Sequence, residues 1–129
     1  MAKKRKMKVL VVDNEQAFAS ILADHLRECG IEAKSVYSGN EALASVPTFR
    51  PDVMIVDLQM PDMSGLDVLS QVKILDPTIE VILLTGNGSF DIGIASMQLG
   101  AYDYVLKPVD LDQLLEIILG AYEKRQKGS

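Results

Sequence analysis

The chain has 129 residues, 48% hydrophobic and 24% charged, which suits one globular domain with a real core. Its net charge of −5 argues against nucleic-acid binding by the domain body. Apolar runs of at most four residues predict no membrane span and no signal peptide, and the lone Cys29 allows no internal disulfide. A cytoplasmic location is expected.

Strand and helix patterns alternate five times along the chain. Strands are predicted near residues 8–12, 32–37, 53–57, 79–84 and 103–106, and helices near 15–28, 39–46, 65–75, 89–99 and 111–125. Such alternation is typical of a parallel sheet with helices on both faces. We expect a basic tail at residues 1–7, a single domain at residues 8–125, and a tail or the start of a linker at residues 126–129.

The first predicted strand is a run of four apolar residues, 9–12, followed directly by Asp13. Such a run is typical of a strand that is buried on both faces. The next helix has an apolar stripe with the i, i+3, i+4, i+7 and i+8 spacing, and Gly30 ends it. The stripe comprises Phe18, Ile21, Leu22, His25 and Leu26. His25 has no second histidine or cysteine pair to form a zinc site, so we interpret it as a residue flanking the core.

The third predicted strand has the same form and ends at Asp57. Asp57 therefore lies at the carboxyl end of an interior strand, where open α/β sheets place their active sites. Capping-box spacing marks the helix on either side of this strand, at Ser38 with Glu41 and at Ser64 with Asp67.

The fourth and fifth predicted strands also end in polar residues, at Thr85 and Lys107 respectively. The helix between them contains Gly93 and is predicted to be the weakest and most mobile of the five. The last helix has capping-box spacing at Asp110 with Gln113.

Four strand ends thus bring one polar side chain each to the same edge of the sheet: Asp13, Asp57, Thr85 and Lys107. Taken singly, Asp13 could be a helix cap, Thr85 an ordinary strand-end residue and Lys107 a solvated lysine. Together, two carboxylates suit a hard cation such as Mg²⁺, while an ammonium and a hydroxyl can hold phosphoryl oxygens. The combination predicts phosphoryl transfer onto a carboxylate, with an aspartyl-phosphate as the product.

The chain resembles the receiver domain of two-component response regulators from Lys8 to about Tyr122. The segments that carry the resemblance are residues 11–15, 57–61, 84–86 and 104–108. The resemblance implies a (βα)5 flavodoxin-like fold, a doubly wound parallel sheet of five strands in the order 2-1-3-4-5. It also implies a phosphoryl donor, either a sensor histidine kinase or a phosphotransfer protein.

The resemblance implies a role for each matching residue. Asp57 is the phosphoacceptor, and Lys107 pairs with the phosphoryl group. Mg²⁺ is held by Asp13, Asn14, Asp57 and the backbone carbonyl of Gln59.

Further implied roles concern the response to phosphorylation. Thr85 and Tyr104 form a switch pair, and the peptide bond before Pro108 is cis. The helix near 89–99, the strand near 103–106 and the last helix form the face that changes. That face would bind an output domain or a second copy of the chain. We expect the domain to catalyse its own Mg²⁺-dependent phosphorylation and dephosphorylation, and to turn over no external substrate.

Asn14 is a departure from the family, which usually has a second acid at this position. The lost charge removes roughly 8 kcal/mol of gross attraction for a divalent ion at about 4 Å, although desolvation cancels much of it. We therefore predict weaker Mg²⁺ binding and slower phosphorylation. Glu15 could compensate in part, or could point away as the first helical residue.

Three alternatives follow from the same residues. Asn14 suggests a pseudo-receiver, a binding module that is not phosphorylated. A phosphatase would need a second acid two residues after Asp57, where the chain has Gln59. A flavodoxin would need an uncharged phosphate cradle where Asp13 and Glu15 stand.

Residues 85–88 look like those of receivers attached to transcription activators.

Overall fold

The structure is a computed structural model that describes residues 6–86 and 90–128. Along these residues the elements are β1 (Lys8–Val12), α1 (Gln16–Glu28), β2 (Glu32–Val36), α2 (Gly39–Phe49), β3 (Val53–Asp57), α3 (Gly65–Leu75), β4 (Glu80–Thr85), α4 (Phe90–Gln98), β5 (Asp103–Leu106) and α5 (Leu111–Gly128). Four sequence predictions lie outside the described residues: tail residues 1–5, activator-like residues 87–88, helix residue Ser89 and the last residue, Ser129.

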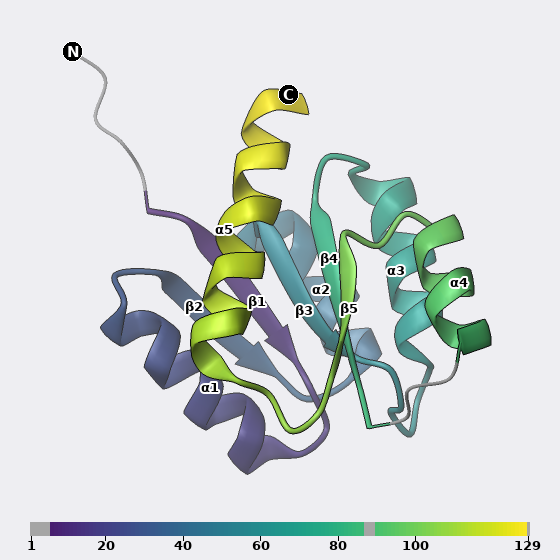
Figure 1. The fold of residues 1–129 in the computed structure, drawn as a ribbon, viewed down its shortest axis with the longest axis horizontal. Helices are drawn as coiled ribbons and strands as arrows, with labels where there is room; N and C mark the ends of the chain where they lie inside the picture. The colour runs from purple at the N-terminus through teal and green to yellow at the C-terminus, as the bar shows by residue number, and fades with distance from the viewer. Residues whose placement is uncertain (1–5, 87–89, 129) are drawn as a thin grey trace.

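The five strands form one parallel sheet in the order β2-β1-β3-β4-β5, which confirms the predicted topology. Figure 1 shows α1 and α5 together on one face of this sheet, and α2 and α3 on the other, with α4 beside α3. Because all strands run the same way, their carboxyl ends share one edge of the sheet. The strand order places β3 at the centre of that edge, with β1 and β4 on either side.

Side-chain alternation along the central strands divides the core into two layers. Val9, Val11 and Ile55 pack with α1 and α5, whereas Leu10 and Val12 pack with α2 and α3. All of these side chains are fully buried, and burying each contributes about 1.5–3 kcal/mol. The uninterrupted apolar runs in the sequence follow from this burial on both faces.

Helix α2 continues three residues beyond its predicted end at residue 46, through Pro47. Pro47 has no N–H, so it removes one hydrogen bond from the last turn of the helix, while its fixed φ is compatible with helical geometry. Arg50 then ends the helix in a left-handed conformation with φ 54°, and its N–H donates to the carbonyl oxygen of Val46. Composition alone does not reveal this ending, because glycine is the residue usually found there. At the other end of the chain, α5 continues past its predicted end at residue 125 to include residues 126–128, for which the sequence predicts a tail or the start of a linker.

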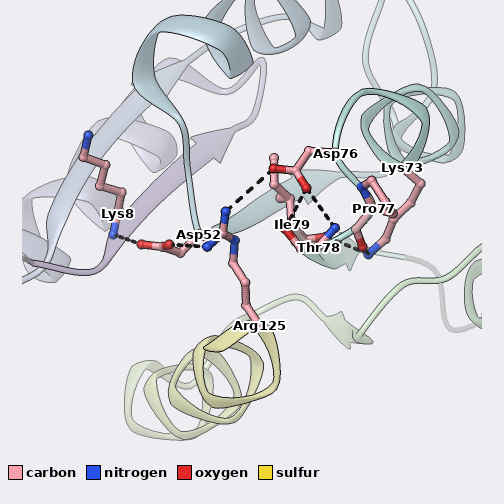
Figure 2. A network of polar contacts seen from close by, with 8 residues as sticks. All are labelled: Lys8, Asp52, Lys73, Asp76, Pro77, Thr78, Ile79 and Arg125. Atoms are coloured by element: carbon pink, nitrogen blue, oxygen red, sulfur yellow. Dashed lines mark hydrogen bonds and ion pairs between the residues drawn. The ribbon is translucent and has the colours of Figure 1, made fainter. Parts of the chain in front are cut away.

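A polar network at the opposite edge of the sheet fastens α5 to the strands (Figure 2). The fully buried Asp52 carboxylate accepts a hydrogen bond from the backbone N–H of Lys8 at 2.8 Å and pairs with Arg125 at 3.1 Å. Arg125 also lies 3.7 Å from Asp76, whose carboxylate accepts two hydrogen bonds from Thr78. This network fixes the end of α5 that is remote from the candidate site.

Candidate functional site

The carboxyl edge of the sheet brings the four predicted polar side chains to one place. Asp13, Asp57 and Thr85 are 0%, 7% and 2% exposed, so the protein surrounds them almost completely. The N–H of Lys107 donates to the carbonyl oxygen of Thr85 at 2.8 Å, which fixes the segment after β5 against the end of β4. The peptide bond between Lys107 and Pro108 is cis.

The Lys107 ammonium is the centre of this arrangement. Its Nζ lies 2.9 Å from Asp13 Oδ2, 3.2 Å from Glu15 Oε1 and 3.5 Å from Asp57 Oδ1. It also lies 4.8 Å from the centre of the Phe18 ring, where a cation is attracted to the aromatic face. Three carboxylates therefore share one ammonium, on a lysine side chain that is only 19% exposed.

The electrostatic environment raises the pKa of both Asp57 and Lys107. Burial raises the pKa of Asp57, the nearby Asp13 charge raises it further, and the Lys107 ammonium opposes them without cancelling them. Burial alone would lower the pKa of Lys107, but its hydrogen bonds to Asp13 and Glu15 and the charges around it raise that pKa overall. Lys107 is therefore a permanent cation at neutral pH.

An open pocket of about 360 Å³ gives access to the site. It is lined by Asn14, Glu15, Asp57, Leu58, Gln59, Thr85, Gly86 and Lys107. A second pocket of about 440 Å³ adjoins it, and Asn14, Leu58 and Gln59 line both. Asp57 is thus buried in the protein but reachable from solvent, as a group that reacts with an incoming molecule must be.

The loop after Asp57 is held by close contacts that no pattern in the sequence indicated. The N–H of Gly65 donates to the carbonyl oxygen of Leu58 at 2.7 Å. A Cβ on Gly65 would lie 2.6 Å from the carbonyl oxygen of Asp57 and 2.9 Å from the Cα of Leu58. Only glycine fits this approach, because both neighbouring atoms belong to the backbone.

Asp62 holds the same loop from its other side. Its carboxylate accepts hydrogen bonds from the N–H groups of Gly39 and Asn40, at 3.1 and 2.9 Å, at the start of α2. Those two hydrogen bonds lower the pKa of Asp62. Helix starts favour carboxylates, but this partner is more than 20 residues away, so no local sequence signal reveals it.

Glu15 lies at the N-cap position of α1, one residue before the helix, and turns toward Lys107. Of the two orientations that the sequence left open, the structure has the one in which Glu15 belongs to the site. Its N–H donates to Asp13 Oδ1 at 2.9 Å, so Asp13 both pairs with Lys107 and orders the start of α1.

Tyr104, the expected partner of Thr85, lies partly buried with its ring against α4. A Cβ on Gly93 would lie 2.7 Å from the hydroxyl oxygen and two carbons of that ring. Gly93, which the sequence identifies only as a weak point in the helix, therefore provides the space that Tyr104 occupies.

The donor atoms at the site suit a hard divalent cation. Asp13 and Asp57 supply carboxylate oxygens at adjacent strand ends, and Asn14 and Gln59 line the same opening. Within residues 6–86 and 90–128, no three His, Cys, Asp or Glu side chains are grouped as a ready-made metal site.

In the same ranges, no helix is long and apolar enough to cross a membrane.

Comparison with known proteins gives consistent matches over nearly the whole chain. The response regulator receiver domain family matches residues 9–119. The DNA-binding transcriptional regulator NtrC of Salmonella typhimurium is 34% identical over 122 residues, which is 92% of this chain but 26% of that protein. The chain therefore spans about a quarter of the length of the curated relatives it matches.

Solved structures give the same result for the fold. A CheY-like receiver domain from Methanospirillum hungatei JF-1 has a TM-score of 0.92 at 27% identity, covering 97% of this chain and 100% of that one. The beryllofluoride-activated NtrC4 receiver domain dimer has a TM-score of 0.86 at 31% identity, covering 92% and 98%.

Proposed function

Because the chain belongs to the response regulator receiver domain family of two-component systems, we propose that it is a phosphorylation-controlled switch in which Asp57 accepts the phosphoryl group. The observation that carries this proposal is the position of Asp57. Its carboxylate is nearly buried, opens to a pocket, and has the Lys107 ammonium 3.5 Å away. A nucleophile that is accessible on one side and paired with a fixed cation suits phosphoryl transfer.

The proposed reaction transfers a phosphoryl group from a phosphohistidine of a sensor kinase or phosphotransfer protein. An Asp57 oxygen attacks phosphorus, the P–N bond to the donor imidazole breaks, and the electron pair of that bond remains on the imidazole nitrogen. Lys107 offsets charge on the phosphoryl oxygens, and the Thr85 hydroxyl can donate a hydrogen bond to one of them. The later hydrolysis returns phosphate and the free Asp57 carboxylate.

Receiver domains typically bind Mg²⁺, and the oxygen donors here fit that ion. Asp13 and Asp57 would hold it with the side-chain oxygen of Asn14 and the backbone carbonyl of Gln59. When bound, Mg²⁺ supplies positive charge that neutralises the phosphoryl oxygens. Burial of Asp13 and Asp57 keeps their carboxylates oriented for this role.

The proposed readout surface is formed by α4, β5 and α5. Ile94, Met97, Leu106 and Leu119 are 41–51% exposed there, so this surface offers large apolar side chains to a partner. Tyr104 reaches α4 at Gly93, so a change at Thr85 that moves this tyrosine would alter that surface. An output domain or a second copy of the chain would bind it.

A pseudo-receiver is the second candidate, and Asn14 is the observation that favours it. Beryllofluoride, which mimics a phosphoryl group on a carboxylate, separates the two candidates. Added with Mg²⁺ to the protein, it should shift the NMR signals of residues around Asp57, Thr85 and Tyr104, and Asp57→Asn should abolish these shifts. Unchanged spectra of the folded wild-type protein at saturating Mg²⁺ and beryllofluoride would refute the switch and favour the pseudo-receiver.

A further inference from the structure

Glu15 immediately precedes α1, yet its side chain turns toward the proposed phosphorylation site and not toward the helix. Acidic side chains near a helix start ordinarily accept hydrogen bonds from its free N–H groups. Among the described residues, the Glu15 side chain makes no such capping bond. Its Oε1 accepts a hydrogen bond from Lys107 Nζ at 3.2 Å instead. The interaction with Lys107 therefore sets the orientation of Glu15.

Glu15 also replaces the charge that Asn14 does not supply. Three carboxylates, those of Asp13, Glu15 and Asp57, surround the single ammonium of Lys107. With an acid at position 14 and a neutral residue at position 15, the site would have the same net charge.

The Lys107 ammonium has partners on two sides, the start of α1 and Asp57. Its Nζ makes hydrogen bonds to Asp13 and Glu15 on the α1 side, whereas Asp57 lies farther away, at 3.5 Å. A phosphoryl group on Asp57 would bring more negative charge to that second position. It would then compete with Glu15 for the same ammonium.

Resting on the proposed function, we propose that Glu15 is a positioning residue for phosphoryl transfer. It attracts the divalent cation to the site and holds Lys107 toward α1 until the phosphoryl group engages that ammonium. Neutralising Glu15 therefore has two effects of opposite sign. Cation binding becomes weaker, whereas binding of an anionic phosphoryl mimic becomes tighter, because a competitor and a repelling charge are both removed.

Solvent screening limits the size of each effect. The Glu15 side chain is 67% exposed, which places its interactions in the range of surface ion pairs. We expect each dissociation constant to change by about two- to fivefold, a range that calorimetric titration resolves.

The test compares Glu15→Gln with Glu28→Gln, which removes the same charge from the exposed opposite end of α1. Each variant is titrated first with Mg²⁺ and then with beryllofluoride at saturating Mg²⁺. Glu15→Gln should bind Mg²⁺ more weakly and beryllofluoride more tightly than wild type, whereas Glu28→Gln should match wild type in both. The double variant Asn14→Asp/Glu15→Gln should recover wild-type Mg²⁺ affinity or exceed it.

The outcomes separate the two proposals. Wild-type protein that binds no beryllofluoride would refute the proposed function, whatever Glu15 does. If wild type binds and Glu15→Gln leaves both constants unchanged, or weakens both together with a lower unfolding temperature, the role of Glu15 is overturned. An unrecovered Mg²⁺ affinity in the double variant would also overturn it.

Discussion

Gly65→Ala tests whether the backbone contact beneath Asp57 positions this proposed phosphoacceptor. The new Cβ would lie 2.6 Å from the carbonyl oxygen of Asp57, about 0.8 Å short of ordinary contact. Overpacking of this kind costs about 1–3 kcal/mol, and the better helix propensity of alanine at the first residue of α3 returns at most about 1 kcal/mol. A net loss of about 1–2 kcal/mol lowers the unfolding temperature of a domain of this size by roughly 3–8 °C.

The functional effect should exceed the stability effect. We expect relief of the clash to displace the backbone of Asp57 and Leu58 together with the start of α3, and small displacements of a reacting group reduce rates strongly. We expect phosphorylation by acetyl phosphate, followed by intact-protein mass spectrometry, to slow by about tenfold or more at a temperature where the variant is folded.

Gly86→Ala is the matched control for this experiment. Gly86 lines the same pocket, but a Cβ added to it would meet no atom of the described residues within 4 Å, its chain neighbours aside. It should unfold at the wild-type temperature. Wild-type stability and rate in Gly65→Ala would refute the reasoning, because the backbone contact would then exert no constraint on Asp57.

Three further predictions concern the metal, the acid stability and the switch. Asn14→Asp should tighten Mg²⁺ binding by about tenfold in calorimetric titration, because about 1.4 kcal/mol of the added electrostatic attraction is expected to remain after the cost of desolvation. An unchanged Mg²⁺ affinity would contradict this prediction. Asp76→Asn should lower stability at neutral pH by about 1 kcal/mol, mainly through the hydrogen bonds from Thr78 that lower the pKa of Asp76. Because the pKa of Asp76 is lowered in the folded protein, its stabilisation is complete above the ordinary pKa and is lost as the pH falls through the lowered one. The difference in urea unfolding should therefore begin to shrink near pH 4 and vanish below the lowered pKa, whereas a difference constant with pH would exclude this origin. Gly93→Ala should displace the Tyr104 ring and shift its NMR signals more than those of the other tyrosines, whereas an unmoved ring would show that the helix has space to spare.

The alternation of strands and helices and the edge of the site could be predicted because both depend on simple periodicity, whereas the order of the strands in the sheet was implied by the resemblance to receiver domains. Strands buried on both faces, such as the run before Asp57, are continuously apolar, and parallel strands end at a shared edge. Asp13, Thr85 and Lys107 could therefore be placed near Asp57 before any contact was known. Their convergence requires only the topology.

The remaining parts of the site depend on contacts between distant segments. The side-chain direction of Glu15 follows from Lys107, which lies 92 residues away in the sequence. The need for glycine at position 65 arises from the backbone of Asp57, and the anchoring of Asp62 arises from α2. None of these has a local pattern, because each depends on tertiary packing rather than on propensity.

The central claim, that Asp57 is the phosphoacceptor, is tested most directly by mapping the modification itself. The protein is incubated with Mg²⁺ and acetyl phosphate, and both intact mass and peptide fragments are measured. We predict the added mass of one phosphoryl group, located on Asp57 and absent from Asp57→Asn. No added mass on the folded wild-type protein, or a phosphoryl group on another residue that persists in Asp57→Asn, would contradict the account.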